Sequence, residues 1–281
     1  MSNLIEKNIP KIYALSFSQA LMLVVPLFVP LASQHQLSLK QIFLTQSAFA
    51  LTVVICELPA GLFADRYSKK VALILGSSFC FAAYFVLLSA SEFNHFIVFE
   101  VLMGLGLSFS SGADYALLYE TRTAINKNES GKEVNAGQLL LLGGLAEGLA
   151  GAIAFGALFY SMKLALILQL MIGLIPLSIA LSLREIPKPC VATQSPKLHE
   201  TAKVVVSNPL MLATFFLLIA FGLMGLLAFW LQQALWIERQ IEPQYFGLLW
   251  AGFCLARALG ALLANRLEAK WGPSKVIALF W

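Results

Sequence analysis

The sequence predicts an all-helical integral membrane protein built from two related halves, the second of them incomplete. Hydrophobic residues make up 59% of the 281 residues and charged residues only 12%, and the mean hydropathy is +0.80. Soluble domains carry about 25% charged residues, so this composition indicates a bilayer protein. The apolar residues gather in long stretches, and one short charged segment occurs twice between such stretches.

Eight apolar stretches reach the length of about 20 residues that a membrane-spanning helix requires. Proline inside some of them is compatible with this prediction, because neighbouring helices can satisfy the carbonyls that it frees. A ninth stretch begins after Lys275 and stops at Trp281. The predicted spans are residues 11–33, 41–63, 71–91, 96–118, 136–160, 164–183, 209–235 and 244–264.

The distribution of lysine and arginine predicts which ends of the spans face the cytoplasm. With a cytoplasmic N-terminus, fifteen of the 19 Lys and Arg fall in cytoplasmic segments, and only Lys40, Lys163 and Arg239 fall outside. Such an excess of positive charge marks the cytoplasmic side. The polar stretch 184–206 is then a cytoplasmic linker between a six-helix half (residues 1–183) and a partial second half (residues 207–281) with helices 7, 8 and the start of 9.

The repeated segment is a charged hairpin between two spans. The first copy reads Gly61-Leu-Phe-Ala-Asp-Arg-Tyr-Ser-Lys-Lys70, and Ala261-Leu-Leu-Ala-Asn-Arg266 repeats its core 200 positions later. Internal repeats of this kind are typical of secondary transporters.

On this hairpin and its degenerate second copy, the chain resembles the major facilitator superfamily. Ser68 stands where that family usually has glycine, and Asn265 replaces the acid in the second copy. The resemblance implies a helical bundle of two six-helix halves, twelve helices in all, and a secondary transporter. Because the sequence supplies eight helices and part of a ninth, we expect a truncated transporter or an incomplete gene product.

Two departures from the family pattern bear on proton coupling. Proton-coupled members often have an arginine four residues before a glycine in helix 4, but here Glu100 precedes Gly104. In helix 5, Gly144, Gly148 and Gly151 are present, but leucine replaces the proline of the antiporter signature. The glycines retained in helix 5 suggest antiport, and the two departures leave it open.

The hairpin provides candidates for gating or coupling residues. Asp65 and Arg66 lie at the cytoplasmic mouth of helix 2, where the acid could cap a helix or pair with bases in one conformation and release them in another. The alternative is a basic loop that only fixes the topology. The candidate gating residues are Asp65, Arg66, Gly61, Lys70, Glu57, Glu120 and Arg122.

Glu147 and Arg257 are candidates for proton or substrate binding, because a charge inside a bilayer is costly. Glu147 lies near the midpoint of helix 5, beside glycines that allow another backbone to approach. Arg257 is the one base inside a predicted span, and the resemblance places helices 5 and 8 side by side. We therefore predict a Glu147–Arg257 ion pair. The alternative for Glu147 is a neutral acid that serves packing.

Three further acids have open roles. Glu57, Gly61 and Asp65 share one face of helix 2, where Glu57 could relay protons or brace the hairpin. Glu100 and Asp114 belong to a polar stripe on helix 4 and could line a substrate path. Interhelical hydrogen bonding is the alternative.

The resemblance also places helices 1 and 7 around a central cavity suited to a flat amphipathic molecule, although Trp236 could instead belong to an interfacial belt. The cavity residues predicted on this basis are Phe17, Gln19, Phe229, Trp230, Gln232, Gln233 and Trp236.

Several functional classes find no support in the sequence. The three histidines and four cysteines show no metal-ligand spacing, so no metal or other cofactor is expected. The small net charge of +4 does not indicate nucleic-acid binding. The chain carries no phosphate-binding loop and no catalytic cluster, so neither an ATP-binding subunit nor an enzyme is predicted.

The leading prediction is a proton-coupled transporter in the bacterial inner membrane that exports a drug-like or metabolite-like organic molecule, with protons, the substrate and the lipid bilayer as its partners. An importer of a nutrient or metal chelate, or an inactive truncated product, are the alternatives.

Overall fold

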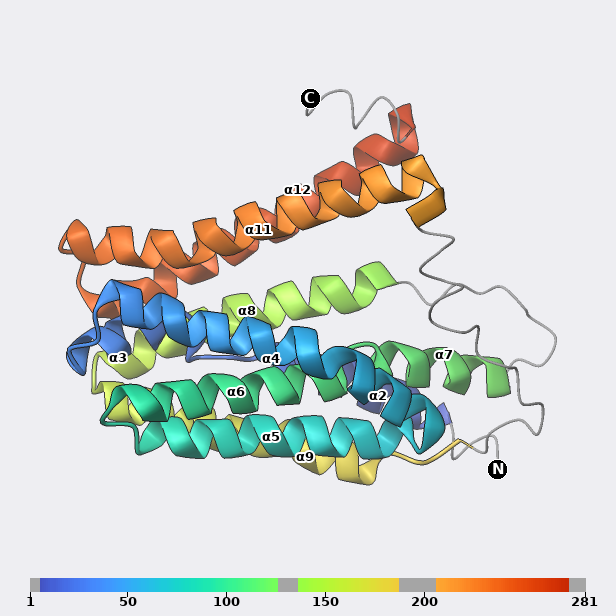
Figure 1. Ribbon diagram of the computed structural model, residues 1–281, viewed down its shortest axis with the longest axis horizontal. Coiled ribbons are helices and arrows are strands. Elements are labelled where there is room, and N and C mark those ends of the chain that lie inside the picture. The colour runs from blue at the N-terminus through green and yellow to red at the C-terminus, as the bar shows by residue number, and fades with distance from the viewer. Residues whose placement is uncertain (1–5, 126–135, 187–205, 273–281) are drawn as a thin grey trace. The chain divides into compact units, whose positions relative to one another are not determined.

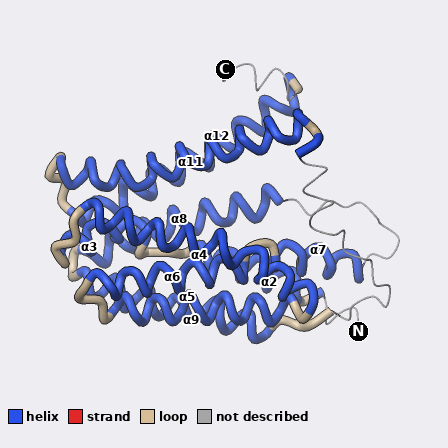
Figure 2. The backbone as a smooth tube through the Cα atoms, viewed as in Figure 1, coloured by secondary structure: helices blue, strands red, loops and turns tan. Residues whose placement is uncertain are grey.

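The computed structural model describes residues 6–125, 136–186 and 206–272, and every regular element within these residues is helical (Figures 1 and 2). The predicted all-helical fold class is therefore confirmed. The elements are, in chain order, α2 (Asn8–Ala20), the 3-10 turn η1 (Val25–Leu27), α3 (Phe28–Gln34), α4 (Leu39–Arg66), α5 (Lys69–Leu88), α6 (Phe93–Ser110), α7 (Ala113–Ile125), α8 (Ala136–Leu158), α9 (Met162–Ser182), α11 (Pro209–Glu238), the 3-10 turn η2 (Pro243–Tyr245) and α12 (Phe246–Trp271).

The chain divides into two compact units, residues 1–186 with 241–281 and residues 187–240. In the described residues, the second unit contains the long apolar helix α11, which Asn208 caps by accepting from the backbone N–H groups of Leu210 and Met211. The first unit contains α2 to α9 and α12. Most of the predicted linker lies outside the described residues, and the predicted domain boundaries stay a prediction.

Seven helical segments of the described residues are long and apolar enough to cross a membrane. They correspond to the first seven predicted spans. The eighth predicted span falls in α12, which is not among the seven segments, so this span stays a prediction. The predicted start of a ninth span lies outside the described residues. The seven segments are residues 8–34, 39–66, 69–88, 93–125, 141–158, 162–182 and 209–238.

The first span is interrupted, whereas the sequence predicted a continuous helix over residues 11–33. α2 ends at Ala20, and Leu21 leaves the helical conformation with φ −79° and ψ 67°. Pro26 explains the interruption, because it has no N–H to donate to the carbonyl of Met22 and its ring crowds that carbonyl. The chain resumes helical structure in η1 and α3.

The fourth span also consists of two helices, which the prediction of one helix over residues 96–118 missed. α6 ends at Ser110, and α7 begins at Ala113. Between them Gly112 has a φ of +74°, a conformation that residues with a Cβ rarely adopt. The glycine therefore allows the chain to bend between the two helices.

The predicted charged hairpin is the turn between α4 and α5. α4 begins at a capping box of Ser38 and Gln41 and runs to Arg66. Ser68 then starts α5, because its Oγ accepts a hydrogen bond from the backbone N–H of Val71 at 3.1 Å. Only Tyr67 and Ser68 separate the two helices.

Within the first unit, the helices pack through apolar and small side chains. α5 lies against α6 and α9, α6 against α4, and α2 against α8 and α9 (Figure 1). α12 packs along α8. One face of α8 is lined by the buried small residues Ala146, Ala150 and Ala154, which join the core around Leu23 and Leu27. Small side chains allow helices in a membrane to approach closely.

Candidate functional site

The structure contains the predicted ion pair between Glu147 of α8 and Arg257 of α12. The Nη2 group of Arg257 donates to Oε2 of Glu147, and Sγ of Cys254 lies 3.5 Å from the same oxygen. The exposed fractions of the two charged side chains are 29% and 51%. The predicted contact is thus confirmed, and both of its side chains are partly exposed. Its role in transport stays a prediction.

Two glycines, Gly151 and Gly247, bring α8 and α12 together, and Gly151 lies one helical turn from Glu147. A Cβ on Gly151 would lie 2.5 Å from the carbonyl oxygen of Gly247 and 3.0 Å from the backbone nitrogen of Ala251. Gly148 has ordinary van der Waals space, and no described atom lies within 4 Å of a Cβ placed on Gly144. The predicted close approach therefore depends on Gly151 and not on Gly144.

A cluster of two acids around one lysine connects the charged hairpin with α7. Nζ of Lys69 lies 3.5 Å from Oδ1 of Asp65 and 2.7 Å from Oε1 of Glu120, which belongs to α7. The Lys69 side chain is only 13% exposed, whereas that of Asp65 is 74% exposed. We call these three residues the hairpin cluster. The sequence reasoning named both acids as candidates but missed Lys69, which joins them.

The other predicted hairpin residues occupy the same end of the first unit. The guanidinium carbon of Arg66 lies 6.0 Å from the centre of the Tyr67 ring. Gly61 is exposed, and Lys70 is the second residue of α5. Arg122 of α7 donates from Nη2 to the hydroxyl of Tyr13 on α2 at 2.8 Å, so it connects these two helices.

Ser68 makes a contact that the sequence reasoning did not predict. Its hydroxyl donates to Oε2 of Glu185, just beyond α9, at 2.6 Å. The neighbouring Arg184 and the side chain of Asn8 exchange two hydrogen bonds, at 2.9 and 3.0 Å. These bonds connect the hairpin, the end of α9 and the start of α2. The replacement of the family's usual glycine by Ser68 was the signal that could have pointed to this contact.

Glu100 and Asp114, which were predicted to share a polar stripe on helix 4, lie on two different helices, α6 and α7. Glu57 is exposed and accepts from Ser111 at 3.3 Å, while Asp114 accepts from Ser16 of α2 at 2.9 Å. The predicted stripe on helix 4 is therefore wrong as a continuous face, because the chain bends at Gly112.

Glu100 is 5% exposed and accepts from Nε2 of Gln46 on α4 at 2.6 Å. Next to it, a Cβ on Gly104 would lie 2.9 Å from Thr52. This is the geometry of an interhelical hydrogen bond, the alternative that the sequence left open. A role of Glu100 in transport stays a prediction.

Gln169 of α9 satisfies the backbone where the first span is interrupted. Its Oε1 accepts from the N–H groups of Leu23 and Val24, at 2.5 and 3.3 Å, and its side chain is 2% exposed. An unsatisfied backbone N–H is costly in a membrane, so this amide stabilises the interruption. The sequence reasoning missed Gln169, although a lone glutamine in an apolar span was a signal.

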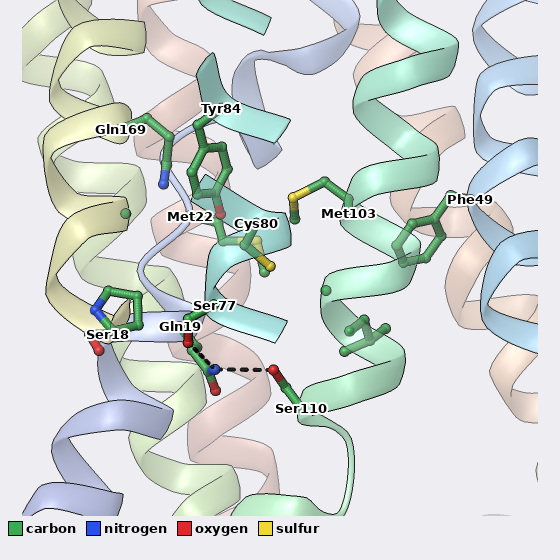
Figure 3. Close-up of a pocket in the computed structure, with 14 residues that line it drawn as sticks. Ser18, Gln19, Met22, Phe49, Ser77, Cys80, Tyr84, Met103, Ser110 and Gln169 are labelled. Atoms are coloured by element: carbon green, nitrogen blue, oxygen red, sulfur yellow. Dashed lines mark hydrogen bonds between the residues drawn. The ribbon is translucent and has the colours of Figure 1, made fainter. Parts of the chain in front are cut away.

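A cavity of about 110 Å³ lies next to this interruption, among α2, α4, α5, α6 and α9 (Figure 3). Nε2 of Gln19 lies 3.2 Å from Oγ of Ser110 and 3.5 Å from Oγ of Ser77. None of the 14 lining residues is Asp, Glu, His, Lys or Arg. Gln19 was predicted to line a cavity between helices 1 and 7. The predicted residues on α11 belong to the other unit, so a cavity shared with them stays a prediction.

In the part of the chain that the structure describes, no group of three or more His, Cys, Asp or Glu side chains could hold a metal ion.

Comparison with known proteins identifies the family. The profile of the Major Facilitator Superfamily matches residues 12–281, nearly the whole chain. The protein therefore belongs to this superfamily of secondary transporters, as the hairpin and its second copy predicted. A search of curated proteins finds no match.

Proposed function

We propose that the protein couples proton movement to the export of a drug-like or metabolite-like organic molecule across a bacterial inner membrane, with its N-terminus in the cytoplasm. The observation that carries this proposal is the Glu147–Arg257 ion pair, formed by two helices that pack closely. Such an acid can gain or lose a proton. Because it contacts a base on another helix, its protonation changes how strongly the two helices attract each other.

The electrostatics explain how such coupling works. While Glu147 is ionised, it compensates the charge of Arg257 at a depth where an uncompensated charge is costly. Protonation removes this compensation and leaves the guanidinium without its charge partner. The free energy of the α8–α12 contact then differs between the two protonation states, and a proton can favour one conformation over the other.

The hairpin cluster supplies a second element of the proposal. Lys69 connects Asp65, at the end of α4, with Glu120 of α7. Breaking either contact allows α4 and α7 to move separately. We assign this cluster the role of a gate in the alternation between inward-open and outward-open states.

Solute-induced proton flux through the purified protein in proteoliposomes tests the proposal. An entrapped pH indicator reports proton movement while a panel of organic solutes is added on one side. We expect one or more solutes to drive proton flux in the wild type and in the control variant Glu238→Gln, whose side chain is exposed at the end of α11. Glu147→Gln should lower the rate of the flux at least about tenfold.

The same assay separates the alternatives. Solute movement that persists unchanged when an ionophore collapses the proton gradient would contradict proton coupling. Movement with the proton, rather than against it, would instead identify an importer. The orientation of the protein in the vesicles, needed for this distinction, follows from protease digestion of residues 184–206.

A further inference from the structure

Glu100 is an acid that the proposed mechanism leaves unused, and it lies between α4 and α6. Among the acids whose side chains the structure describes, it alone is buried, with an exposed fraction of 5%. Oε1 of its carboxyl accepts from Nε2 of Gln46 at 2.6 Å. The partner of Glu147 is a guanidinium, whereas the partner of Glu100 is a neutral amide.

This neutral partner bears on the charge of Glu100. None of the ion pairs among the described residues includes its carboxyl. A buried carboxylate beside one neutral donor is costly, because a single amide hydrogen bond does not replace the water that the charge loses. Protonation removes this cost, and the neutral acid still accepts from Gln46. The contacts therefore favour the protonated carboxylic acid.

Other titratable groups on the neighbouring elements do not compensate a charge on Glu100. In the described residues, none of them forms a hydrogen bond or an ion pair with its carboxyl. The titratable groups in the same half of these elements are Lys40 on α4, Cys80 and Tyr84 on α5, Glu92 and His95 at the start of α6, and His35 after α3.

Close packing of α4 and α6 separates the carboxyl from bulk water. A Cβ on Gly104, one turn after Glu100, would lie 2.9 Å from Cβ of Thr52 and 3.0 Å from the carbonyl oxygen of Phe49. The two helices cannot separate here without losing these contacts. A proton on Glu100 therefore needs another route to water.

The cavity beside α2 offers such a route, because its lining begins about one turn from the Gln46–Glu100 hydrogen bond. Phe49 and Met103 line the cavity (Figure 3). They follow Gln46 and Glu100 by three residues, which places each pair on one face of its helix.

The cavity is large and polar enough to hold water. A buried water needs roughly 10–15 Å³ and two to four polar partners. The cavity measures about 110 Å³, which is several times this minimum. Gln19 supplies an amide at its polar end, and Ser110 and Ser77 supply hydroxyls 3.2 and 3.5 Å from the amide nitrogen. Water held there can accept a proton that leaves Glu100.

We infer that Glu100 is a second proton-binding residue, which holds a proton in the conformation described and exchanges it through water in the neighbouring cavity. On release the carboxyl O–H bond breaks, its electron pair stays on the carboxylate and the proton passes to water. The Gln46 amide continues to donate to the carboxylate. A part for Glu100 in coupling rests on the proposed function, whereas the proton binding does not.

Infrared spectroscopy of the full chain in bilayers of an ether-linked phosphatidylcholine tests the proton binding, since this lipid contributes no ester carbonyl. At neutral pH we expect the carbonyl band of a protonated carboxylic acid, which should be absent in Glu100→Gln. Gln retains an oxygen that can accept from Gln46, so the variant keeps the interhelical hydrogen bond. Glu100→Asp retains an acid and should keep a band, which controls for misfolding.

Exchange of the buffer for D₂O tests whether this proton is mobile. The band should move to lower frequency as deuterium replaces the proton. Identical spectra of the wild type and Glu100→Gln in the carboxylic-acid region would show that Glu100 is ionised. A band that keeps its frequency in D₂O would show a sealed packing acid. Either result would overturn the inference.

Two variants test the route through the cavity. Gln19→Leu removes the amide that holds water at the polar end and should slow the isotope shift at least about threefold. Ser78→Ala should leave the rate unchanged, because the Ser78 hydroxyl bonds to its own helix at Ile74. Equal rates in the wild type and Gln19→Leu would overturn the cavity as the route.

The flux assay then tests the part of Glu100 in coupling. Glu100→Gln should lower the number of protons moved per solute about twofold, because one of two proton-binding acids is lost. The exposed acid at the start of the same helix provides the control Glu92→Gln, which should leave the ratio unchanged. An unchanged ratio in Glu100→Gln would overturn this part of the inference.

The outcomes distinguish this inference from the proposed function. An exchangeable Glu100 band without any solute-induced proton flux would support the proton-binding residue and contradict the transport proposal. Proton-coupled flux without an exchangeable Glu100 band would overturn the inference and leave the function standing.

Discussion

The α8–α12 contact and the cavity beside α2 place polar groups between helices in two different ways. In the contact, opposite charges on Glu147 and Arg257 meet beside the close approach at Gly151 and Gly247. In the cavity, Gln19 and two serines form neutral hydrogen bonds, with Gln169 satisfying the backbone nearby. The charged contact changes with protonation, whereas the neutral cavity does not.

This difference suggests a division of roles. A site that responds to protonation is suited to coupling, because proton binding changes its free energy. A cavity lined by no Asp, Glu, His, Lys or Arg side chain gives protonation near neutral pH no such effect.

Gly151→Leu should have the largest effect on stability. A side chain at this position must displace the backbone of Gly247 and Ala251, which cannot move without separating α8 from α12. We expect a loss of about 3 kcal/mol in unfolding free energy, seen as a lower midpoint in thermal unfolding of the purified protein. Gly156→Leu is the control, since Gly156 is exposed on the same helix with no described atom near its Cβ position. Equal effects of both variants would refute the close approach.

Gln169→Leu should destabilise the first unit by about 2 kcal/mol. The leucine fills the space but leaves the N–H groups of Leu23 and Val24 without an acceptor. Thermal unfolding measures the effect, with Ser178→Ala on the same helix as the control, because that hydroxyl bonds only to its own helix at Leu174. A variant as stable as the wild type would show that the interruption does not need this amide.

Ser68→Ala should cost about 1 kcal/mol, because the α5 N-cap and the bond to Glu185 are both lost. Ser68→Gly restores the residue usual in the family and should recover most of the capping contribution, since glycine is a tolerable N-cap. Glu185→Ala isolates the remaining contact, because it removes the acceptor of the Ser68 hydroxyl. If all three variants unfold at the wild-type temperature, the connection between the hairpin and the end of α9 contributes nothing.

Lys69→Met should change stability least, by less than about 1 kcal/mol, since ion pairs at helix ends are partly solvated. Its effect on transport should be larger, because it removes the base that joins Asp65 to Glu120. Raising the salt concentration should weaken this cluster in the wild type more than the ion pair between α8 and α12. Transport rates measured from low to high salt test this, and a rate independent of both salt and Lys69 would exclude a gating role.

The sequence was sufficient to predict most of the apolar spans, the charged hairpin and, with the family resemblance, the Glu147–Arg257 contact. Long apolar runs define spans, and an acid and a base inside them must find partners. Family resemblance then indicated which helices adjoin. The hairpin was recognised from its charges and its repeat, and α4 and α5 meet at Ser68, within the predicted turn.

The sequence was insufficient where a feature depended on a neighbour far along the chain. Pro26 and Gly112 were visible as residues, but membrane helices often tolerate both, so the interruptions they mark could not be inferred. Gln169 contacts a backbone about 145 positions away, which no local pattern reveals. Lys69 was overlooked because its burial between two acids becomes apparent only when α5 and α7 are placed together.

The central claim is that Glu147 and Arg257 act as one unit in proton coupling. A double-mutant cycle on solute-induced proton flux tests it most directly, with Glu147→Gln, Arg257→Ala and the double variant reconstituted in the same vesicles. We predict that each single variant loses at least about tenfold in rate and that the double variant is no slower than the slower single one, a coupling of about 1.4 kcal/mol or more. Losses that simply multiply in the double variant would show that the two residues act independently and would contradict the claim.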